Sequence, residues 1–237
     1  MAIQLYPPLK EVRYGTKKVS VEKWADYTRY ISQPFGAGKD NPLYTETLKL
    51  DGHNGVDVPL FDGTPVYAMN DGIVQFAGRD GTGSWSVELW DDVNLYKTVY
   101  YHAQVGGLEV KRGQRIKHGA LLGYWDSTGY STGHHLHFGL KETDKKGATI
   151  NRYNGYNGAI DPLPFRVDYD MTKLIRVQGG KKVYLVDAEG LRNWLPDGTD
   201  LSKFGGWSAV ENISQEEFNS IPYGGSLVGF NTDDPGA

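Results

Sequence analysis

The chain has 237 residues, of which 39% are hydrophobic and 23% charged, and its formal net charge is −4. This length suffices for one ordinary domain with a small companion. Residues 170–237 carry 6 basic and 10 acidic side chains, and neither part of the chain has the basic footprint of a nucleic-acid-binding protein. No cysteine is present, so disulfides give no indication of the compartment.

Residues 1–32 are polar and aromatic, and we expect them to form an N-terminal lead-in with a short helix near 20–29. The first ten residues lack both the basic and the apolar region of a signal peptide. No stretch approaches the roughly 20 apolar residues of a membrane span. The sequence therefore predicts neither a signal peptide nor a membrane span.

Residues 33–168 are predicted to form the main domain, because short strand-like runs alternate there with Gly, Asp and Asn turns. The expected strands are 64–69, 73–77, 84–90, 97–101, 120–125 and 136–140. Two glycine-punctuated hairpins, 62–74 and 110–123, resemble the barrel-sandwich arrangement that several unrelated families share. We expect a mainly β, antiparallel domain, with a mobile loop near residues 141–160.

The residue pattern changes after residues 166–170 to a compact series of short apolar runs. Residues 170–237 are therefore predicted to form a second, small β-rich module. Three short strands are expected at 174–177, 183–186 and 193–195, with turns at Gly179-Gly180 and Glu189-Gly190. Ser214 to Glu217 fits a capping box, which predicts a short helix near 214–220.

Two short histidine motifs carry the chemistry. His53 and Asp57 form an H-x-x-x-D segment, and His135 and His137 form an H-x-H segment about eighty residues later. Catalytic zinc sites use three His or carboxylate ligands and leave the fourth position for water, whereas structural sites lean on cysteine. On an extended strand, His135 and His137 point to the same face, so one can bind the metal while the other reaches the substrate. The pattern predicts a mononuclear zinc site with hydrolytic chemistry.

Three segments in this order, 53–57, 101–102 and 131–138, resemble the lysostaphin-like (LytM-type) zinc endopeptidases that cut peptidoglycan cross-bridges. The resemblance covers roughly residues 33–165. It implies that His53, Asp57 and His137 are the zinc ligands and that His102 and His135 are catalytic, one as general base and the other as oxyanion donor. It leaves open which of the two has which role. The implied substrate is bacterial peptidoglycan.

The sequence departs from the family pattern at three positions. His134 stands where Pro or Ala is usual, Gly139 stands where a polar residue is common, and Thr47 stands where members often have a tyrosine that supports the transition state. Either Tyr44 takes that role through a different loop path or the site manages without it. By alternation His134 faces away from His135 and His137, so it is not counted as a ligand, and we interpret His118 as a surface residue.

Other functions remain to be distinguished. Some relatives have lost zinc and only regulate other wall hydrolases, and phosphocarriers share the fold with two active histidines, although they would not need Asp57. The C-terminal module is expected either to bind the wall or to pack against the catalytic domain. Without an export signal, we expect a phage-type lysin or virion-borne hydrolase, and alternatively a secreted enzyme whose leader is missing. The cleaved bond and the oligomeric state are not predicted.

Overall fold

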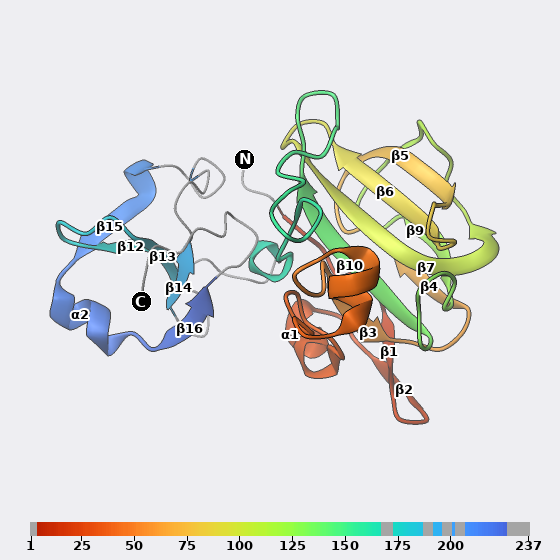
Figure 1. The fold of residues 1–237 in the computed structure, drawn as a ribbon, viewed down its shortest axis with the longest axis horizontal. Helices are drawn as coiled ribbons and strands as arrows, with labels where there is room; N and C mark the ends of the chain where they lie inside the picture. The colour runs from red at the N-terminus through yellow and green to blue at the C-terminus, as the bar shows by residue number, and fades with distance from the viewer. Residues whose placement is uncertain (1–3, 167–172, 187–191, 196–200, 202–206, 227–237) are drawn as a thin grey trace. The chain divides into compact units, whose positions relative to one another are not determined.

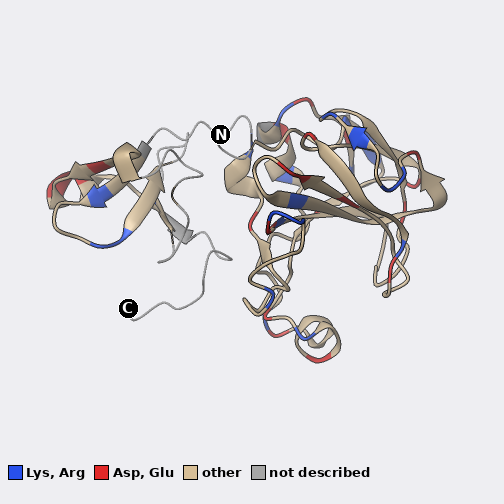
Figure 2. Ribbon diagram, turned by 90° about the horizontal axis from the view of Figure 1, so that it is seen from above, with Lys and Arg blue, Asp and Glu red and all other residues tan. Residues whose placement is uncertain are grey.

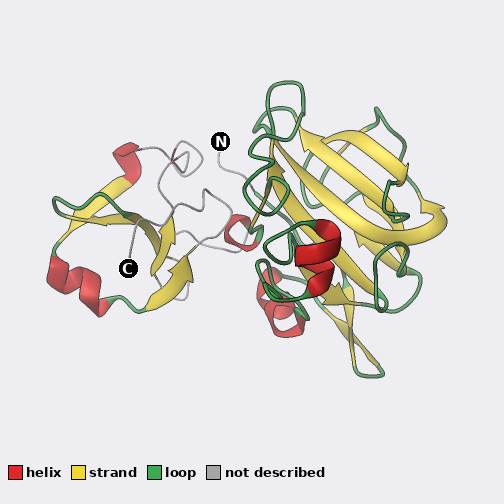
Figure 3. Cartoon of the chain, viewed as in Figure 1, coloured by secondary structure: helices red, strands yellow, loops and turns green. Residues whose placement is uncertain are grey.

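The computed structural model describes residues 4–166, 173–186, 192–195, 201 and 207–226, as drawn in Figure 1. The chain divides into two compact units: Gln4–Asp168, and Tyr169–Ala237 together with Met1–Ile3. Strands dominate both units, and helices are few and short (Figure 3). The predicted mainly β fold is confirmed.

The larger unit is built on one nine-stranded sheet whose pairs are all antiparallel. Its strands are β3 (Val56–Pro59), β4 (Thr64–Tyr67), β5 (Gly72–Arg79), β6 (Trp85–Asp91), β7 (Tyr96–Leu108), β8 (Arg115–Ile116), β9 (Leu121–Trp125), β10 (His135–Glu142) and β11 (Ala159–Ile160). Each of the six predicted strands coincides with one of these, so the predicted positions are confirmed.

Strand β7 connects the two parts of this sheet. Its first half pairs with β6 and β10, and its second half pairs with β9 at Ala103 and Leu108. Strand β9 in turn pairs with β4, and β3 adds to β10. Because the long strand β7 belongs to both parts of the sheet, the sheet curves around one core (Figure 1).

Large aromatic side chains fill that core. Trp24, Tyr96, Tyr100, Trp125 and Phe138 are each no more than 1% exposed. Their polar tips find partners: Trp125 Nε1 donates to the Tyr101 carbonyl at 2.6 Å, and the Tyr100 hydroxyl accepts the Met69 amide at 2.8 Å. Burying each ring contributes roughly 1.5–3 kcal/mol, and the paired tips avoid the cost of a lost hydrogen bond.

The N-terminal segment belongs to the same core. It forms a hairpin of β1 (Glu11–Tyr14) and β2 (Lys17–Ser20), then α1 (Trp24–Tyr27), which continues as a 3-10 turn over Thr28–Tyr30. The helix predicted near 20–29 is present but shorter, and the hairpin was not predicted. The Trp24 ring lies 5.7 Å from that of Phe138 in β10, and its Nε1 donates to the Leu5 carbonyl at 2.8 Å. Tertiary packing therefore fixes this segment more than its periodicity does.

Two segments outside the predicted strands differ from the sequence expectation. A π-helical turn over Leu43–Leu48, which the sequence did not predict, carries the buried Tyr44. The predicted loop 141–160 is partly ordered into strands, because β10 runs to Glu142 and β11 pairs with it. Basic and acidic residues are interspersed along the described part of this unit (Figure 2).

The smaller unit is a five-stranded sheet with the order β15-β12-β13-β14-β16. Its strands are β12 (Lys173–Val177), β13 (Val183–Val186), β14 (Arg192–Leu195), β15 (Val210–Ile213) and β16 (Tyr223–Ser226). The three predicted strands are confirmed, and two more join them by parallel pairing. The predicted helix is α2 (Gln215–Ser220), where Ser214 Oγ accepts the Glu217 amide at 3.1 Å. The turn expected at Glu189-Gly190 lies outside the described residues.

Candidate functional site

Antiparallel pairing brings Asp57 and His137 together. Asp57 in β3 stands directly opposite His137 in β10, and His53 reaches the same point from the turn before β3. His53 Nε2, Asp57 Oδ1 and His137 Nδ1 form a nearly equilateral triangle, with separations of 3.1, 3.0 and 3.0 Å. All three side chains are buried. A tetrahedral site with arms of about 2.1 Å has edges of about 3.4 Å, so the triangle is close to the size that one ion requires.

The surroundings of the triad also suit a cation. His53 Nδ1 lies 3.1 Å from the Pro34 carbonyl, and a proton on Nδ1 leaves the Nε2 lone pair for a metal. Burial opposes ionisation of Asp57, but its contacts with His137 and His53 hold its pKa well below the usual range, while burial lowers the pKa of His137. A carboxylate with neutral imidazoles is the protonation state that metal binding needs. His53, Asp57 and His137 can therefore hold a metal ion.

Two glycines make room for this arrangement. A Cβ at Gly55 would collide with the ring of His137 and the carbonyl of Phe138. A Cβ at Gly139 would lie 3.1 Å from the Asn54 carbonyl. Glycine at both positions lets the turn that follows His53 approach β10 closely. The departure from the family pattern at Gly139 thus has a packing reason.

His102 and His135 lie beside the triad and have a different kind of partner. His102 Nδ1 is 2.7 Å from the Thr128 carbonyl, and His135 Nδ1 is 2.8 Å from the Gly133 carbonyl. In both rings, a proton on Nδ1 leaves Nε2 without a proton. The ring centroids are 4.5 Å apart, and His135 Nε2 lies 3.5 Å from Asp57 Oδ2. Burial lowers the pKa of His102 to about 3, so this ring is neutral at neutral pH.

The backbone turns His102 toward the site. Tyr101 pairs opposite His137, so simple alternation along β7 would place His102 on the other face of the sheet. His102 instead has φ of +75°, in the left-handed region that a residue with a side chain seldom adopts. Such backbone strain is found at functional sites more often than elsewhere.

All five histidine and aspartate residues of the triad and the pair line one groove. Its cavity has a volume of about 1050 Å³. Tyr44 also lines the groove, with its ring 5.7 Å from His53, whereas Thr47 is exposed and does not. Burial, with the nearby charge of Asp57, raises the pKa of Tyr44 to about 12, so its hydroxyl keeps its proton. The sequence left open whether Tyr44 replaces the usual tyrosine or the site works without one. In the structure, Tyr44 lies at the site.

The two remaining histidines lie elsewhere. His118 is half-exposed and bonds to Asp71, with Nδ1 2.9 Å from Oδ1. His134 contacts Asp126 and does not line the groove. The sequence did not reveal the loop carbonyls of Thr128 and Gly133 that lie against the Nδ1 atoms of His102 and His135, because a backbone carbonyl leaves no signature in a residue pattern.

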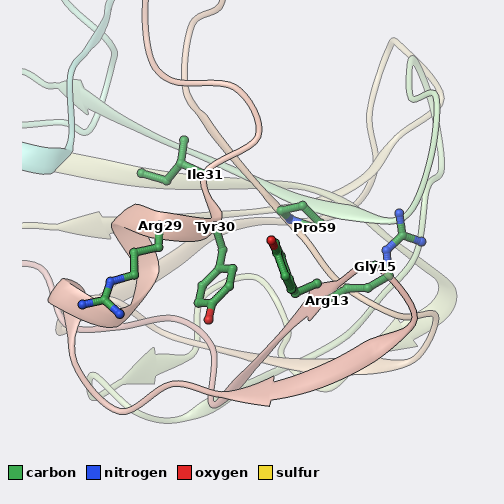
Figure 4. Close-up of a pocket in the computed structure, with 7 residues that line it drawn as sticks. Arg13, Gly15, Arg29, Tyr30, Ile31 and Pro59 are labelled. Atoms are coloured by element: carbon green, nitrogen blue, oxygen red, sulfur yellow. The ribbon is translucent and has the colours of Figure 1, made fainter.

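A smaller cavity of about 250 Å³ lies beside the N-terminal hairpin (Figure 4). Its lining includes Arg13, Tyr30, Ile31 and Pro59. The guanidinium groups of Arg13 and Arg29 lie on opposite sides of it and point away from each other (Figure 4). Rings and aliphatic carbons, rather than converging charges, therefore define this cavity.

The β fold, the groove and the His–Asp–His triad on its floor agree with the resemblance of the sequence to LytM-type zinc endopeptidases. Residues 51–152 match the sequence profile of peptidase family M23. This match covers less than half of the chain and includes His53, Asp57, His102, His135 and His137.

Several known proteins are similar to part of this chain. The DD-carboxypeptidase/endopeptidase Mpg of Neisseria meningitidis is 38% identical over 112 residues, which cover 47% of this chain and 24% of that protein. The glycyl-glycine endopeptidase ALE-1 of Staphylococcus capitis is 36% identical over 114 residues, which cover 48% and 28%. The matched part thus spans about a quarter of the length of these relatives. The structure of lysostaphin from Staphylococcus simulans is similar with 33% identity and a TM-score of 0.40, over 48% of this chain and 43% of that one.

Proposed function

We propose that this chain is a zinc-dependent endopeptidase that hydrolyses peptide cross-bridges or stem peptides of bacterial peptidoglycan. The observation that carries the proposal is that the His and Asp side chains of the groove fall into two groups with different partners. Three side chains converge on one point at separations of 3.0–3.1 Å. Two further histidines lie within the same groove, and the Nδ1 atom of each faces a loop carbonyl. A ligand set of two imidazoles and one carboxylate is typical of catalytic zinc.

Zinc held by His53, Asp57 and His137 would polarise a substrate carbonyl and lower the pKa of a bound water to about 7. His102 and His135 supply the proton chemistry. One ring accepts the proton of the attacking water at Nε2 and returns it to the leaving amine. The other ring, in its protonated form, donates from Nε2 to the oxyanion. The Nδ1 contacts with loop carbonyls hold both rings in the orientation that this exchange needs.

The groove is suited to an extended peptide. Its volume of about 1050 Å³ is at the upper end of the range for small-molecule pockets. The exposed rings of Tyr130 and Tyr153 and the side chain of Arg152 lie along it. Two relatives are named for acting on different bonds, one glycyl-glycine and the other DD. We therefore propose the substrate class, wall peptides, and leave the bond to experiment.

Digestion of purified sacculi from several bacterial species tests the proposal. Mass analysis of the released muropeptides should show new peptide termini at one bond type and no cleavage in the glycan. A chelator should abolish release and added zinc should restore it. If metal-loaded protein releases nothing from any sacculus and cleaves no bridge or stem peptide, the proposal is wrong. The alternative, a regulator of other wall hydrolases, would then be favoured, although the complete ligand set speaks against it.

We further propose that the smaller unit helps the enzyme to find the wall. Its described surface includes two exposed rings, Trp207 and Tyr223, which are 63% and 58% exposed. Arg176 lies over the Trp207 ring at 5.8 Å. Tethering a catalytic groove to an insoluble polymer raises its effective concentration there. Pull-down of an isolated 170–237 fragment with purified walls tests this role.

A further inference from the structure

A second group of metal-ligating side chains lies outside the groove. Asp62 comes from the connection between β3 and β4, Asp126 follows β9, and His134 precedes β10. One potential ligand atom from each lies within 4.8 Å of the others. His134 Nδ1 is 2.7 Å from Asp126 Oδ1. Two connections, β3–β4 and the two ends of β9–β10, thus bring an imidazole and two carboxylates together.

The contact between His134 and Asp126 is close but is not a hydrogen bond. His134 Nδ1 is sealed from solvent and makes no hydrogen bond, although the carboxylate oxygen is only 2.7 Å away. Asp57 Oδ1 in the groove behaves in the same way, since ring nitrogens at 3.0 and 3.1 Å leave it without a hydrogen bond. The two imidazoles of the triad do meet in a hydrogen bond at 3.0 Å, so the off-axis geometry belongs to the contacts between imidazole and carboxylate. An imidazole and a carboxylate that bind one cation approach each other off axis, because each directs a lone pair at the ion.

The His118 pair shows the ordinary alternative. His118 Nδ1 lies 2.9 Å from Asp71 Oδ1, and this contact is a hydrogen bond with proper geometry. The two exterior His–Asp pairs therefore have the same chemical groups at nearly the same separation but different directions. Only the His134 pair has the off-axis geometry of the groove triad.

We propose that Asp62, Asp126 and His134 form a second site, for a divalent transition cation. An imidazole nitrogen favours ions such as Zn²⁺ or Mn²⁺ over Mg²⁺ and Ca²⁺, which prefer all-oxygen sites. Gln104 Nε2 donates to Asp62 Oδ1 at 2.9 Å, which orients the carboxylate and leaves Oδ2 for the ion. Asp62 is exposed, so its side chain can rotate to close the remaining distance, and water completes the coordination shell.

An ion at this site would stabilise the backbone segments that carry His102 and His135. The Asp126 amide donates to the His102 carbonyl at 2.9 Å, and the His135 amide donates to the Asp126 carbonyl at 3.3 Å. His134 is the chain neighbour of His135. The cation would thus connect the backbone segments on which both groove histidines stand, and Asp62, Asp126 and His134 would act as positioning residues.

Metal stoichiometry tests the second site, and its binding does not depend on any enzymatic activity. Full-length protein is stripped, dialysed to equilibrium against Zn²⁺ or Mn²⁺ over a concentration series, and measured by elemental analysis. We expect one tight and one weaker ion per wild-type chain. His134→Ala should keep the tight ion and weaken the other by at least about tenfold. His137→Ala should lose the tight ion and keep the weaker one, so failure of the groove site and failure of the second site give different results.

His118→Ala is the matched control and should bind both ions as wild type does. Asp126→Asn provides a second variant that keeps the shape of the side chain, in case His134→Ala does not fold, and circular dichroism together with the retained tight ion reports folding. A wild-type chain that binds one ion only overturns the proposal. So does a second ion that His134→Ala and Asp126→Asn bind as tightly as wild type does, or one that His118→Ala loses.

Discussion

The floor of the groove, with His53 and His137, and its rim, with His102 and His135, hold their histidines by different means. On the floor, His53 and His137 contact Asp57 and each other. At the rim, His102 and His135 are fixed by loop carbonyls. Side chains that converge on one carboxylate can hold an ion, whereas rings whose Nδ1 faces a loop carbonyl present Nε2 to the groove. Under the proposed function, the partner of each histidine distinguishes a metal ligand from a catalytic residue.

The largest effect is expected on the floor. Asp57→Ala or His137→Ala should reduce bound zinc in the groove from near one ion per chain to near zero, because two ligands cannot hold the ion tightly. Peptide cleavage should fall to the background of the assay. Elemental analysis of protein purified without chelator measures the metal, and His118→Ala serves as the control. An alanine variant at either position that keeps its ion would remove the distinction between floor and rim.

Changes at the rim should lower turnover without loss of the metal ion. His102→Ala and His135→Ala should each lower turnover by about a hundredfold or more, the usual scale for losing a general base or an oxyanion donor. Zinc content should stay at the wild-type value in both. Steady-state kinetics on a soluble peptide and metal analysis of the same samples check this. Loss of zinc from either variant would mean that a ligand has been mistaken for a catalyst.

Tyr44 lines the same groove, with its ring 5.7 Å from that of His53, and a change at this residue tests the groove beyond the five His and Asp side chains. Tyr44→Phe should lower turnover by about tenfold, which corresponds to roughly 1.4 kcal/mol and is typical of one hydrogen bond. Thr47→Ala, at the exposed position where family members often have the tyrosine, should have no effect. Unchanged turnover in Tyr44→Phe would show that the site works without a tyrosine.

The smallest effect on the chemistry is expected from removal of the smaller unit. A chain ending at Asp168 should keep its zinc and cleave a small soluble peptide at the wild-type rate, because every groove residue precedes that point. Activity on intact sacculi should fall, and comparison of the two substrates measures targeting. Equal rates on sacculi would contradict the wall-finding role, and aggregation of the shortened chain would indicate that the unit covers apolar surface.

The sequence predicted six of the nine strands of the main sheet, because each of these is an apolar run between glycine or aspartate turns; β3, β8 and β11 are short and were not predicted. The hairpin Glu11–Tyr14 and Lys17–Ser20 was not predicted, since this segment is polar, and the helix that follows it is held by Trp24 packing on Phe138. The π-helical turn at Leu43–Leu48 has no periodic signal that would reveal it. The sequence pattern gives no local signal for either the hairpin or this turn.

The site was predicted in part by periodicity and in part by resemblance. Alternation correctly indicates that His135 and His137 share a face and that His134 does not. Alternation alone would place His102 on the wrong face, and only the resemblance assigned it to the site. The structure supplies the missing reason, a left-handed residue within β7. A pattern of residue types does not encode that local departure from strand geometry.

The left-handed backbone at His102 also implies a trade between stability and activity. A side chain in this conformation costs roughly 1–2 kcal/mol, a cost that glycine does not bear. His102→Gly and His102→Ala both remove the imidazole, but only alanine retains the Cβ. The glycine variant should therefore unfold at a higher temperature than the alanine variant, by about 2–8 °C for a chain of this size, while both have low activity. Under the proposed function, the histidine at this position lowers stability in exchange for its role in the reaction.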